Sequence, residues 1–423
     1  MRTGANEGKR PRVVVVGGGF GGLAAARELR RADVDVVLVD RKNHHVFQPL
    51  LYQVATGELT PASIAAPLRA LLSKQRNCSV LLGEVEAVDL DAREIAFAER
   101  KLSYDALVVA CGARHGYFGH DEWERVAPGL KTIEDATEMR RRLFLAFEAA
   151  ERCEDPEVER EFLTFVIVGA GPTGVELAGA LSETAHYALE HDFRSIDPSH
   201  ARILLVEAGG RVLSMYPDDL SRRAVEKLDA LHVEVLVDTK VVEVADDHVV
   251  VEGKEGKERV RTRTVLWAAG AVAAPIGRKL VGDRTDLVDR SGRVLVEEDC
   301  SLAGHPEVFV VGDPRELPPS GRRTVARRRA RRAPAGTPRR APGPARPRRS
   351  SARALPLRGP RSDGGGRTLV RGGDDRTLAF RGRARVVRVA LRPPHADHAL
   401  PQSRPGPPAV GLDLLHARTE RRA

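Results

Sequence analysis

Short apolar runs alternate with amphipathic stretches through the first three quarters of the chain. Residues 13–16 are four consecutive valines, which is typical of a parallel strand buried on both faces. A glycine-rich turn follows, then a helical stretch over residues 23–31 and a second apolar run over residues 34–39. The pattern predicts a βαβ unit near the N-terminus.

The same succession starts again at residues 165–168, with glycines, a predicted helix over residues 175–191 and a strand over 203–206. Further predicted strands cover residues 80–90, 95–97, 107–110, 233–237, 249–251, 265–269 and 308–311. Asp135 is the predicted cap of a connecting helix. Two such openings, about 150 residues apart, indicate duplication of a domain rather than a short repeat. We therefore predict an α/β fold with two Rossmann-like dinucleotide-binding domains.

Charge divides the chain into two unequal parts. Residues 314–423 hold 28 of the 68 basic residues and 7 of the 59 acidic residues, which leaves 40 basic and 52 acidic residues for positions 1–313. The acidic body gives no reason to expect a nucleic-acid partner. The four cysteines are far apart and form no metal-binding spacing, so we predict no metal site and a reducing, cytoplasmic environment. Neither a secretory signal nor a membrane-spanning helix is predicted.

The first glycine-rich turn has the G-x-G-x-x-G spacing of a dinucleotide site, in Gly17, Gly19 and Gly22. The first glycine permits a tight turn, the second lets the backbone approach a pyrophosphate, and the third lets helix and strand pack closely. Asp40 ends the next strand, where a carboxylate accepts hydrogen bonds from ribose hydroxyls. Strand, helix and acid together favour a nucleotide site over a glycine-rich turn without a ligand.

The second glycine-rich turn has the same spacing, in Gly169, Gly171 and Gly174. Glu207 ends the second strand of this βαβ unit, as Asp40 does in the first. A carboxylate at this position pairs with free ribose hydroxyls and repels a 2′-phosphate, which favours NAD over NADP. The alternative is a surface glutamate without a ligand, and Arg211 leaves NADP binding open. Two dinucleotide sites in one chain predict hydride transfer between two cofactors, for which FAD and NAD(P)H are the usual pair.

Several motifs resemble the type II NADH:quinone oxidoreductases. The most specific is Phe-Gln-Pro-Leu-Leu-Tyr-Gln-Val-Ala-Thr-Gly at residues 47–57. Residues 171–179, residues 206–208 and Phe118-Gly119-His120 resemble the same family. The resemblance covers residues 12–313. It implies FAD in the first fold, NADH in the second, and transfer of electrons to a membrane quinone.

The resemblance also implies roles for individual residues. Glu176 would lie near the nicotinamide where it meets the flavin; the alternative is an acid favoured by the helix macrodipole. Cys111 stands where the family more often has threonine, and we expect a small buried residue there rather than a redox centre. The predicted cofactor-binding set is Gly17, Gly19, Phe20, Gly22, Asp40, Arg41, Gln53, Ala110, Cys111, Gly112 and Asp313 for FAD, and Gly169, Gly171, Thr173, Gly174, Glu207, Ala269 and Gly270 for NADH.

The predicted domains are residues 10–118 (FAD, first part), 119–290 (NADH), 291–313 (FAD, return segment) and 314–423, an Arg/Pro-rich tail. The tail has 28 arginines, no lysine and 16 prolines, a composition that predicts disorder. Arginine without lysine is also typical of GC-rich DNA read in another frame. A one-base shift over residues 319–341 permits the family's Gly-Val-Ala-Pro and Gln-Gln-Gly segments, and over 405–417 an apolar, aromatic stretch like its membrane-binding C-terminus. We hypothesise a frameshift, or a sequencing error that mimics one, between residues 312 and 319.

The resulting prediction is a peripheral enzyme on the cytoplasmic face of the membrane. If the frameshift is real, this chain would no longer bind the membrane or the quinone. A homodimer is left open. Three alternatives stay open too: a reductase of a protein electron carrier, a truncated protein that binds nucleotide without turnover, and an Arg-rich nucleic-acid binder. The last depends on the tail alone.

Overall fold

Two parallel sheets organise the chain. The computed structural model describes residues 10–312, 315–316, 376–382 and 385–391. The first sheet has the order β20-β21-β9-β1-β2-β5, and all neighbours are parallel except β20 and β21. Its strands are β1 (Arg12–Val16), β2 (Asp35–Asp40), β5 (Cys78–Leu82), β9 (Ala106–Val109), β20 (Ser301–Leu302) and β21 (His305–Val310).

The second sheet is fully parallel, with the order β13-β12-β11-β17. Its strands are β11 (Thr164–Val168), β12 (Arg202–Val206), β13 (Val233–Leu236) and β17 (Thr264–Trp267). Every residue of β11 and β17 is buried, as expected for parallel strands covered on both faces. Both predicted βαβ units are therefore present, and the α/β prediction is confirmed.

The two folds repeat each other strand by strand. β1 pairs with β2 on one side and β9 on the other, and β11 pairs in the same way with β12 and β17. Each fold also inserts a three-stranded antiparallel sheet before its last equivalent strand. These sheets are β6 (Val85–Asp89), β7 (Glu94–Phe97) and β8 (Arg100–Ser103) in the first fold, and β14 (Lys240–Val244), β15 (His248–Gly253) and β16 (Gly256–Arg261) in the second.

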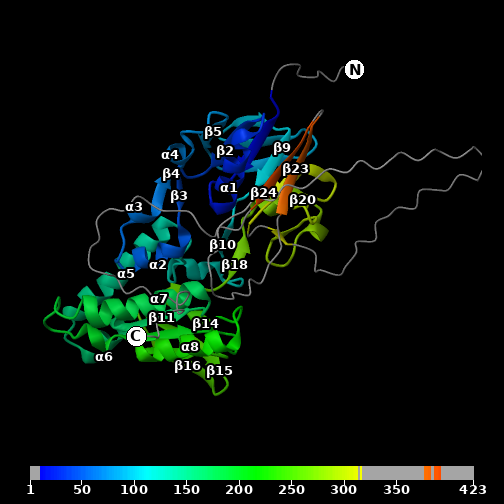
Figure 1. Ribbon diagram of the computed structural model, residues 1–423. Helices are drawn as coiled ribbons and strands as arrows, with labels where there is room; N and C mark the ends of the chain where they lie inside the picture. Colours follow the sequence, from blue (N-terminus) through cyan, green and yellow to red (C-terminus); the bar gives the residue numbers. More distant parts are fainter. Residues whose placement is uncertain (1–9, 313–314, 317–375, 383–384, 392–423) are drawn as a thin grey trace, which may run out of the picture. The chain divides into compact units, whose positions relative to one another are not determined.

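A short ribbon joins the two folds. β10 (Ala113–His115) follows β9, β18 (Ala271–Ala273) follows β17, and the two strands pair antiparallel with Arg114 opposite Val272. Figure 1 shows β10 and β18 side by side. Because each strand leaves the carboxyl end of its own parallel sheet, the ribbon joins the two edges at which parallel sheets bind ligands.

Helices and shorter strands complete the described part. The α-helices are α1 (Phe20–Glu28), α2 (Leu51–Ala55), α3 (Pro61–Ile64), α4 (Leu68–Leu72), α5 (Ile133–Glu151), α6 (Pro156–Phe162), α7 (Pro172–Glu183), α8 (Asp218–Ala230) and α9 (Ile276–Val281). Shorter helical turns are η1 (Leu29–Arg31), η2 (Gln48–Leu50), η3 (Asp121–Arg125), the π-turn η4 (Thr184–Ala188), η5 (Pro198–His200) and η6 (Thr285–Leu287). The remaining strand pairs are β3 (His44–Val46) with β4 (Ala65–Pro67), β19 (Val294–Leu295) with β22 (Arg315–Glu316), and β23 (Arg376–Gly382) with β24 (Arg385–Leu391).

Two local predictions are wrong. The predicted strand over residues 80–90 is two strands in different sheets, β5 and β6. The break falls at Gly83, where a Cβ would lie 2.5 Å from the ring of Phe97 in β7, so the backbone there packs closely against the sheet of β6 and β7. The connecting helix α5 begins at Ile133 and is capped by Thr132, not Asp135. Asp135 instead occupies the third helical position and completes a capping box with Thr132.

The apolar core of the first fold includes residues that come earlier in the chain than its predicted return segment, which was expected to begin at residue 291. Ile276 and Leu280 of α9 are buried in one cluster with Val14, Val37 and Val308 of the first sheet. We therefore propose that the boundary between the folds lies before α9 rather than at residue 290. The tail prediction for residues 314–423 falls mostly outside the described residues. Within it, the structure describes β22, which pairs with β19, and the hairpin β23–β24.

Candidate functional site

The first glycine turn has a geometry that only glycine satisfies at two of its positions. Gly17 has φ +105°, and a Cβ added there would lie 2.4 Å from the carbonyl oxygen of Ala110. A Cβ at Gly22 would lie 1.8 Å from Gly17 O. At Gly19, the residue before α1, an added Cβ would meet no atom within 4 Å. The turn is therefore tight against the sheet and open where a phosphate would approach the helix N-terminus.

Asp40 is fixed beside this turn by two backbone N–H groups. Its Oδ2 accepts from Gly18 at 2.5 Å, and its Oδ1 accepts from Lys42 at 2.6 Å. The carboxylate is half-buried at the end of β2. Each oxygen keeps unused acceptor capacity, so Asp40 holds the loop and still presents an acceptor beside it.

The second turn reproduces this geometry. Gly169 has φ +99°, and a Cβ at Gly174 would again lie 1.8 Å from the carbonyl oxygen of the first glycine. A Cβ at Gly171 would meet no atom within 4 Å. Glu207 accepts from the backbone N–H of Ala170 and of Gly209, both at 2.7 Å. The acid therefore has the same relation to its glycine turn as Asp40 has to the first.

The third strand of each fold ends in matching segments. In the first fold, the backbone N–H of Ala110 donates to Val16 O at 2.8 Å. Gly112, two residues later, has φ +68°. In the second fold, Ala269 lies against Gly169, and Gly270 has φ +63°. Cys111 donates to Val16 O at 3.6 Å, and burial, with a contribution from Asp40, raises the pKa of its thiol to about 12. A thiol that stays protonated is a poor nucleophile, which agrees with a packing role.

The other predicted residues are distributed around these two turns. Phe20, the first residue of α1, contacts His45 and Phe47 edge to face, with ring centroids 4.9 and 5.6 Å apart. Arg41 follows β2 and is exposed. Thr173 is the second residue of α7. Asp313 lies outside the described residues.

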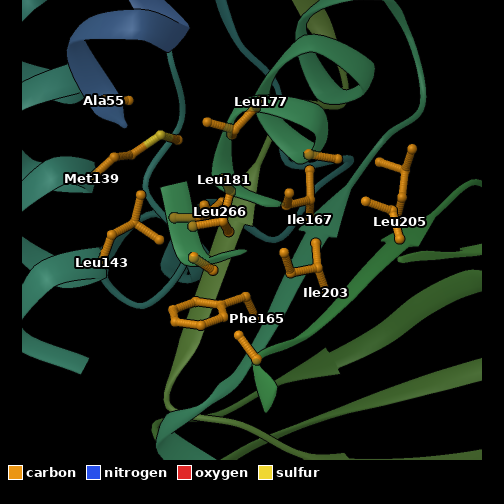
Figure 2. Packing of buried hydrophobic residues seen from close by; sticks show 14 of the residues in the cluster. Ala55, Met139, Leu143, Phe165, Ile167, Leu177, Leu181, Ile203, Leu205 and Leu266 are labelled. Carbon is orange, nitrogen blue, oxygen red and sulfur yellow. The ribbon is translucent and has the colours of Figure 1, made fainter. Parts of the chain in front are cut away.

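Packing of α2 against α7 brings two distant predicted segments together. Val54 and Ala55 from the Phe47–Gly57 motif belong to one buried cluster with Val175 and Leu177 of α7. Figure 2 shows this packing around Ala55, Met139 and Leu177. The motif that supplies the predicted FAD residue Gln53 is therefore next to the helix that carries Glu176, although the two are more than a hundred residues apart in sequence.

Acidic side chains gather where α2 and α7 meet. Burial raises the pKa of Glu176 to about 7. Burial, with the charges of Glu176, Glu58 and Glu183, raises the pKa of Tyr52 to about 12. Burial raises the pKa of Glu58 as well, although it accepts from Gln53 Nε2 at 3.0 Å and from Thr56 Oγ1 at 3.3 Å. The arrangement holds a carboxyl group that exchanges its proton near neutral pH.

The position of Glu176 in α7 distinguishes its two interpretations, a residue near the nicotinamide and an acid favoured by the helix macrodipole. It is the fifth residue of α7, and no acid lies in the first turn of that helix. The geometry therefore disfavours a simple helix-start acid. Sequence reasoning missed Glu58 and Glu183, because their proximity depends on packing between α2 and α7 and leaves no local signal.

Sequence relatives decide the family. A model of the pyridine nucleotide-disulphide oxidoreductases matches residues 11–335, so the match ends inside the Arg-rich tail. The chain is 46% identical over 310 residues to the type II NADH:quinone oxidoreductase Ndh of Mycobacterium tuberculosis, which covers 72% of this chain and 67% of that protein. The chain belongs to the type II NADH:quinone oxidoreductases. The predicted resemblance is confirmed.

A more distant sequence relative and a solved structure are also similar to the chain. The type II NADH:quinone oxidoreductase of Staphylococcus haemolyticus is 27% identical over 319 residues, covering 74% of this chain and 76% of that protein. The structure of NDH2 from Plasmodium falciparum in complex with NADH superimposes with a TM-score of 0.67 at 22% identity, covering 73% of this chain and 65% of that one. The chain thus spans about two thirds of the length of Ndh and of NDH2.

Family membership makes this chain a flavoprotein of the NADH dehydrogenase class, with FAD and NADH as cofactors. The two open glycine turns fit two such dinucleotides, since a side chain at Gly19 or Gly171 would occupy the space that each leaves free. No helix among the described residues is long and apolar enough to cross a membrane. The same part of the chain has no group of three metal-ligating side chains placed to hold an ion.

Proposed function

We propose that the chain binds FAD at the first fold and NADH at the second, and oxidises NADH. Gly17, Gly19, Gly22 and Asp40 would hold FAD, together with Phe20, Arg41, Gln53, Ala110, Cys111, Gly112 and Asp313. Gly169, Gly171, Gly174 and Glu207 would hold NADH, together with Thr173, Ala269 and Gly270. The observation that carries the proposal is the duplicated turn, with its open glycine at the helix start and its acid bound to the turn backbone.

Bound FAD supplies a two-electron acceptor for hydride. The chain's own residues would orient the reactants and control protons. Glu58 accepts a hydrogen bond from the amide of Gln53, and Gln53 belongs to the helix α2 that packs against α7. Glu176 would hold or release a proton at its carboxyl group near neutral pH, where the nicotinamide is expected.

The acceptor that we propose is a membrane quinone, by analogy with the names of the relatives. The enzyme would work at the membrane surface on the cytoplasmic side, and a homodimer is compatible with the family. We propose that the quinone and membrane sites need the segments that the shifted frame over residues 319–341 and 405–417 would encode, and both segments lie outside the described residues. The quinone and membrane partners therefore depend on the C-terminal segment.

The test uses the purified protein with its reading frame corrected by deletion of one base near codon 314, and with added FAD, because the uncorrected 423-residue chain is expected to reduce no quinone. Anaerobic NADH should bleach the visible absorbance of bound flavin, and a soluble quinone analogue should restore it. The matched variants are Gly19→Val and Gly171→Val, which fill the open positions of the two turns. Gly19→Val should abolish flavin retention, and Gly171→Val should abolish only reduction by NADH. Flavin retention that neither substitution alters would refute the assignment of the sites.

A second candidate is a protein that binds nucleotide without turnover. It is favoured by the change of composition after residue 313 and by the match over only two thirds of the length of Ndh. NADH binding without flavin reduction, in the presence of excess FAD, would support this alternative over the enzyme.

A further inference from the structure

We propose that Phe118 packs against the nicotinamide half of NADH and contributes to its affinity. The inference depends on the proposed binding of NADH to the second fold. Phe118 is 75% exposed, a large fraction for a phenylalanine beside so many buried aromatic residues. Its ring tip lies over Gly270, where a Cβ would approach Phe118 Cζ to 3.2 Å.

Its neighbours anchor the segment and leave the Phe118 ring outside. Tyr117 is buried, donates from its hydroxyl to Ala127 O at 2.9 Å, and lies 5.0 Å from Trp267 between ring centroids. His120 stacks on Trp123 at 4.2 Å. Buried Tyr117 and Trp123 thus hold the chain before and after Phe118, while the Phe118 side chain stays exposed.

The backbone at Phe118 is strained. Phe118 has φ +55° and Gly119 has φ +98°. Positive φ is unusual for a bulky side chain and costs free energy, and such residues concentrate at binding sites. An exposed apolar residue alone would need no explanation. An exposed aromatic ring, held at a strained position against a predicted cofactor residue, indicates a ligand contact.

The strand order of the second sheet indicates which half of NADH the Phe118 ring would contact. β12 and β17 lie on opposite sides of β11 in the order β13-β12-β11-β17. Glu207 follows β12 and would take the adenosine ribose, and the open Gly171 turn after β11 would take the pyrophosphate. The remaining half of NADH would therefore extend toward the end of β17, where Gly270 and Phe118 lie. Aromatic rings bind planar bases through their faces and edges.

The fluorescence of the chain's own tryptophans can be used to measure NADH binding beside Phe118. It has two tryptophans, Trp123 and Trp267, and both belong to the aromatic cluster beneath Phe118, at 5.6 Å from each other. Trp267 lies 6.3 Å from the Phe118 ring. Because reduced nicotinamide absorbs where tryptophan emits, energy transfer from these two residues reports NADH binding directly. The measurement needs neither bound flavin nor quinone turnover.

The experiment titrates the full chain with NADH and follows tryptophan emission. Phe118→Ala should raise the Kd for NADH about tenfold, within the range that an aromatic contact with a base supplies. Phe118→Tyr should stay within about twofold of the wild type. Tyr187→Ala is the matched control, because Tyr187 is an equally exposed aromatic residue, at 71%, in η4 at the far end of α7. It should bind NADH as the wild type does.

ADP-ribose, which lacks the nicotinamide, separates the two halves by calorimetry. Its Kd should change less than about twofold in Phe118→Ala, whereas an equal loss for ADP-ribose and NADH would overturn the assignment to the nicotinamide half. Wild-type NADH affinity in Phe118→Ala would overturn the proposal. If that variant loses the near-UV circular dichroism of the folded cluster, Phe118→Leu replaces it, and unchanged affinity there overturns the proposal equally. Absence of NADH binding in the wild type would instead refute the proposed function of the second fold.

Discussion

Asp40 and Glu207 follow the same path in the two folds: each accepts a hydrogen bond from its glycine turn, and each would also face the proposed nucleotide. Glu207 accepts hydrogen bonds from the backbone of the Gly169 turn and of Gly209, beside the proposed nucleotide position. Arg211, which left NADP open at the level of sequence, pairs with Asp218 and donates to Ser214 O at 2.7 Å. Since its guanidinium already has partners, the structure favours NADH further than the sequence could.

Replacing Glu207 with Gln should raise the affinity for NADPH relative to NADH by about tenfold, because it removes a negative charge within a few Å of the proposed 2′-phosphate position. Gln keeps one acceptor for the turn backbone, which limits the loss of structure. Tryptophan energy transfer gives both dissociation constants without turnover. Glu226→Gln, an exposed acid on α8, is the control and should leave the ratio unchanged. An unaltered ratio in Glu207→Gln would remove this residue from cofactor choice.

Glu176 should make stability depend on pH in a defined direction. Burial raises its pKa from the ordinary 4.5 to about 7 in the folded chain, so between these values the folded state binds more protons than the unfolded state. Stability contributed by the neutral acid is therefore present below about pH 4.5 and lost as pH rises through 7. Glu176→Gln should be more stable than wild type above pH 7 by about 1 kcal/mol, discounted because the carboxyl is partly exposed.

Urea unfolding at several pH values, without added nucleotide, tests this prediction. The gap between Glu176→Gln and wild type should close toward pH 4.5. Glu190→Gln, an exposed acid beyond the end of α7, provides the comparison and should follow the wild type at every pH. A gap that is constant across pH would mean that Glu176 is charged throughout, and would contradict a role in proton exchange.

Elements were predictable where one physical signal dominates. The valine run of β1 and the glycines after it can form little other than a buried strand and a tight turn, and the same holds for β11. The break between β5 and β6 was not predictable, because it depends on the close packing of Gly83 against Phe97 of β7. The pairing of β10 with β18, and the acids that meet between α2 and α7, are likewise products of distant packing.

The cap of α5 is a local element whose contribution can be measured. Thr132 Oγ1 accepts from Asp135 N at 3.1 Å, and Asp135 Oδ2 accepts from Thr132 N at 2.8 Å. Thr132→Ala should lower the free energy of unfolding by about 1 kcal/mol, and Thr132→Ser should be nearly neutral. The measurement is urea unfolding of the two variants beside wild type. Equal stability of Thr132→Ala and Thr132→Ser would show that this box does not stabilise the start of α5.

At the scale of the whole molecule, the two folds differ in what they need from the C-terminus. The second sheet is complete between β11 and β17, within residues 164–267. The first sheet receives β21 at residues 305–310, immediately before the composition changes. The predicted flavin residue Asp313, and the segments that would complete the flavin and quinone sites in the shifted frame, all come after that point. NADH binding should therefore be independent of the tail, whereas flavin retention and quinone reduction should depend on it.

The last prediction follows from this difference. The 423-residue chain should bind NADH, retain FAD weakly and reduce no quinone even with excess FAD, because its C-terminal composition differs from the segment that the shifted frame would encode. Deleting one base, or adding two, near codon 314 should restore FAD retention, quinone reduction and binding to lipid vesicles together. Adding one base opens the third frame and is the matched control; it should restore none of them. The NADH dissociation constant, measured by calorimetry, should be the same in all three proteins, because the second sheet is unchanged. Stoichiometric FAD and quinone reduction in the uncorrected chain would refute the frameshift, and the Arg-rich tail would then belong to the working enzyme.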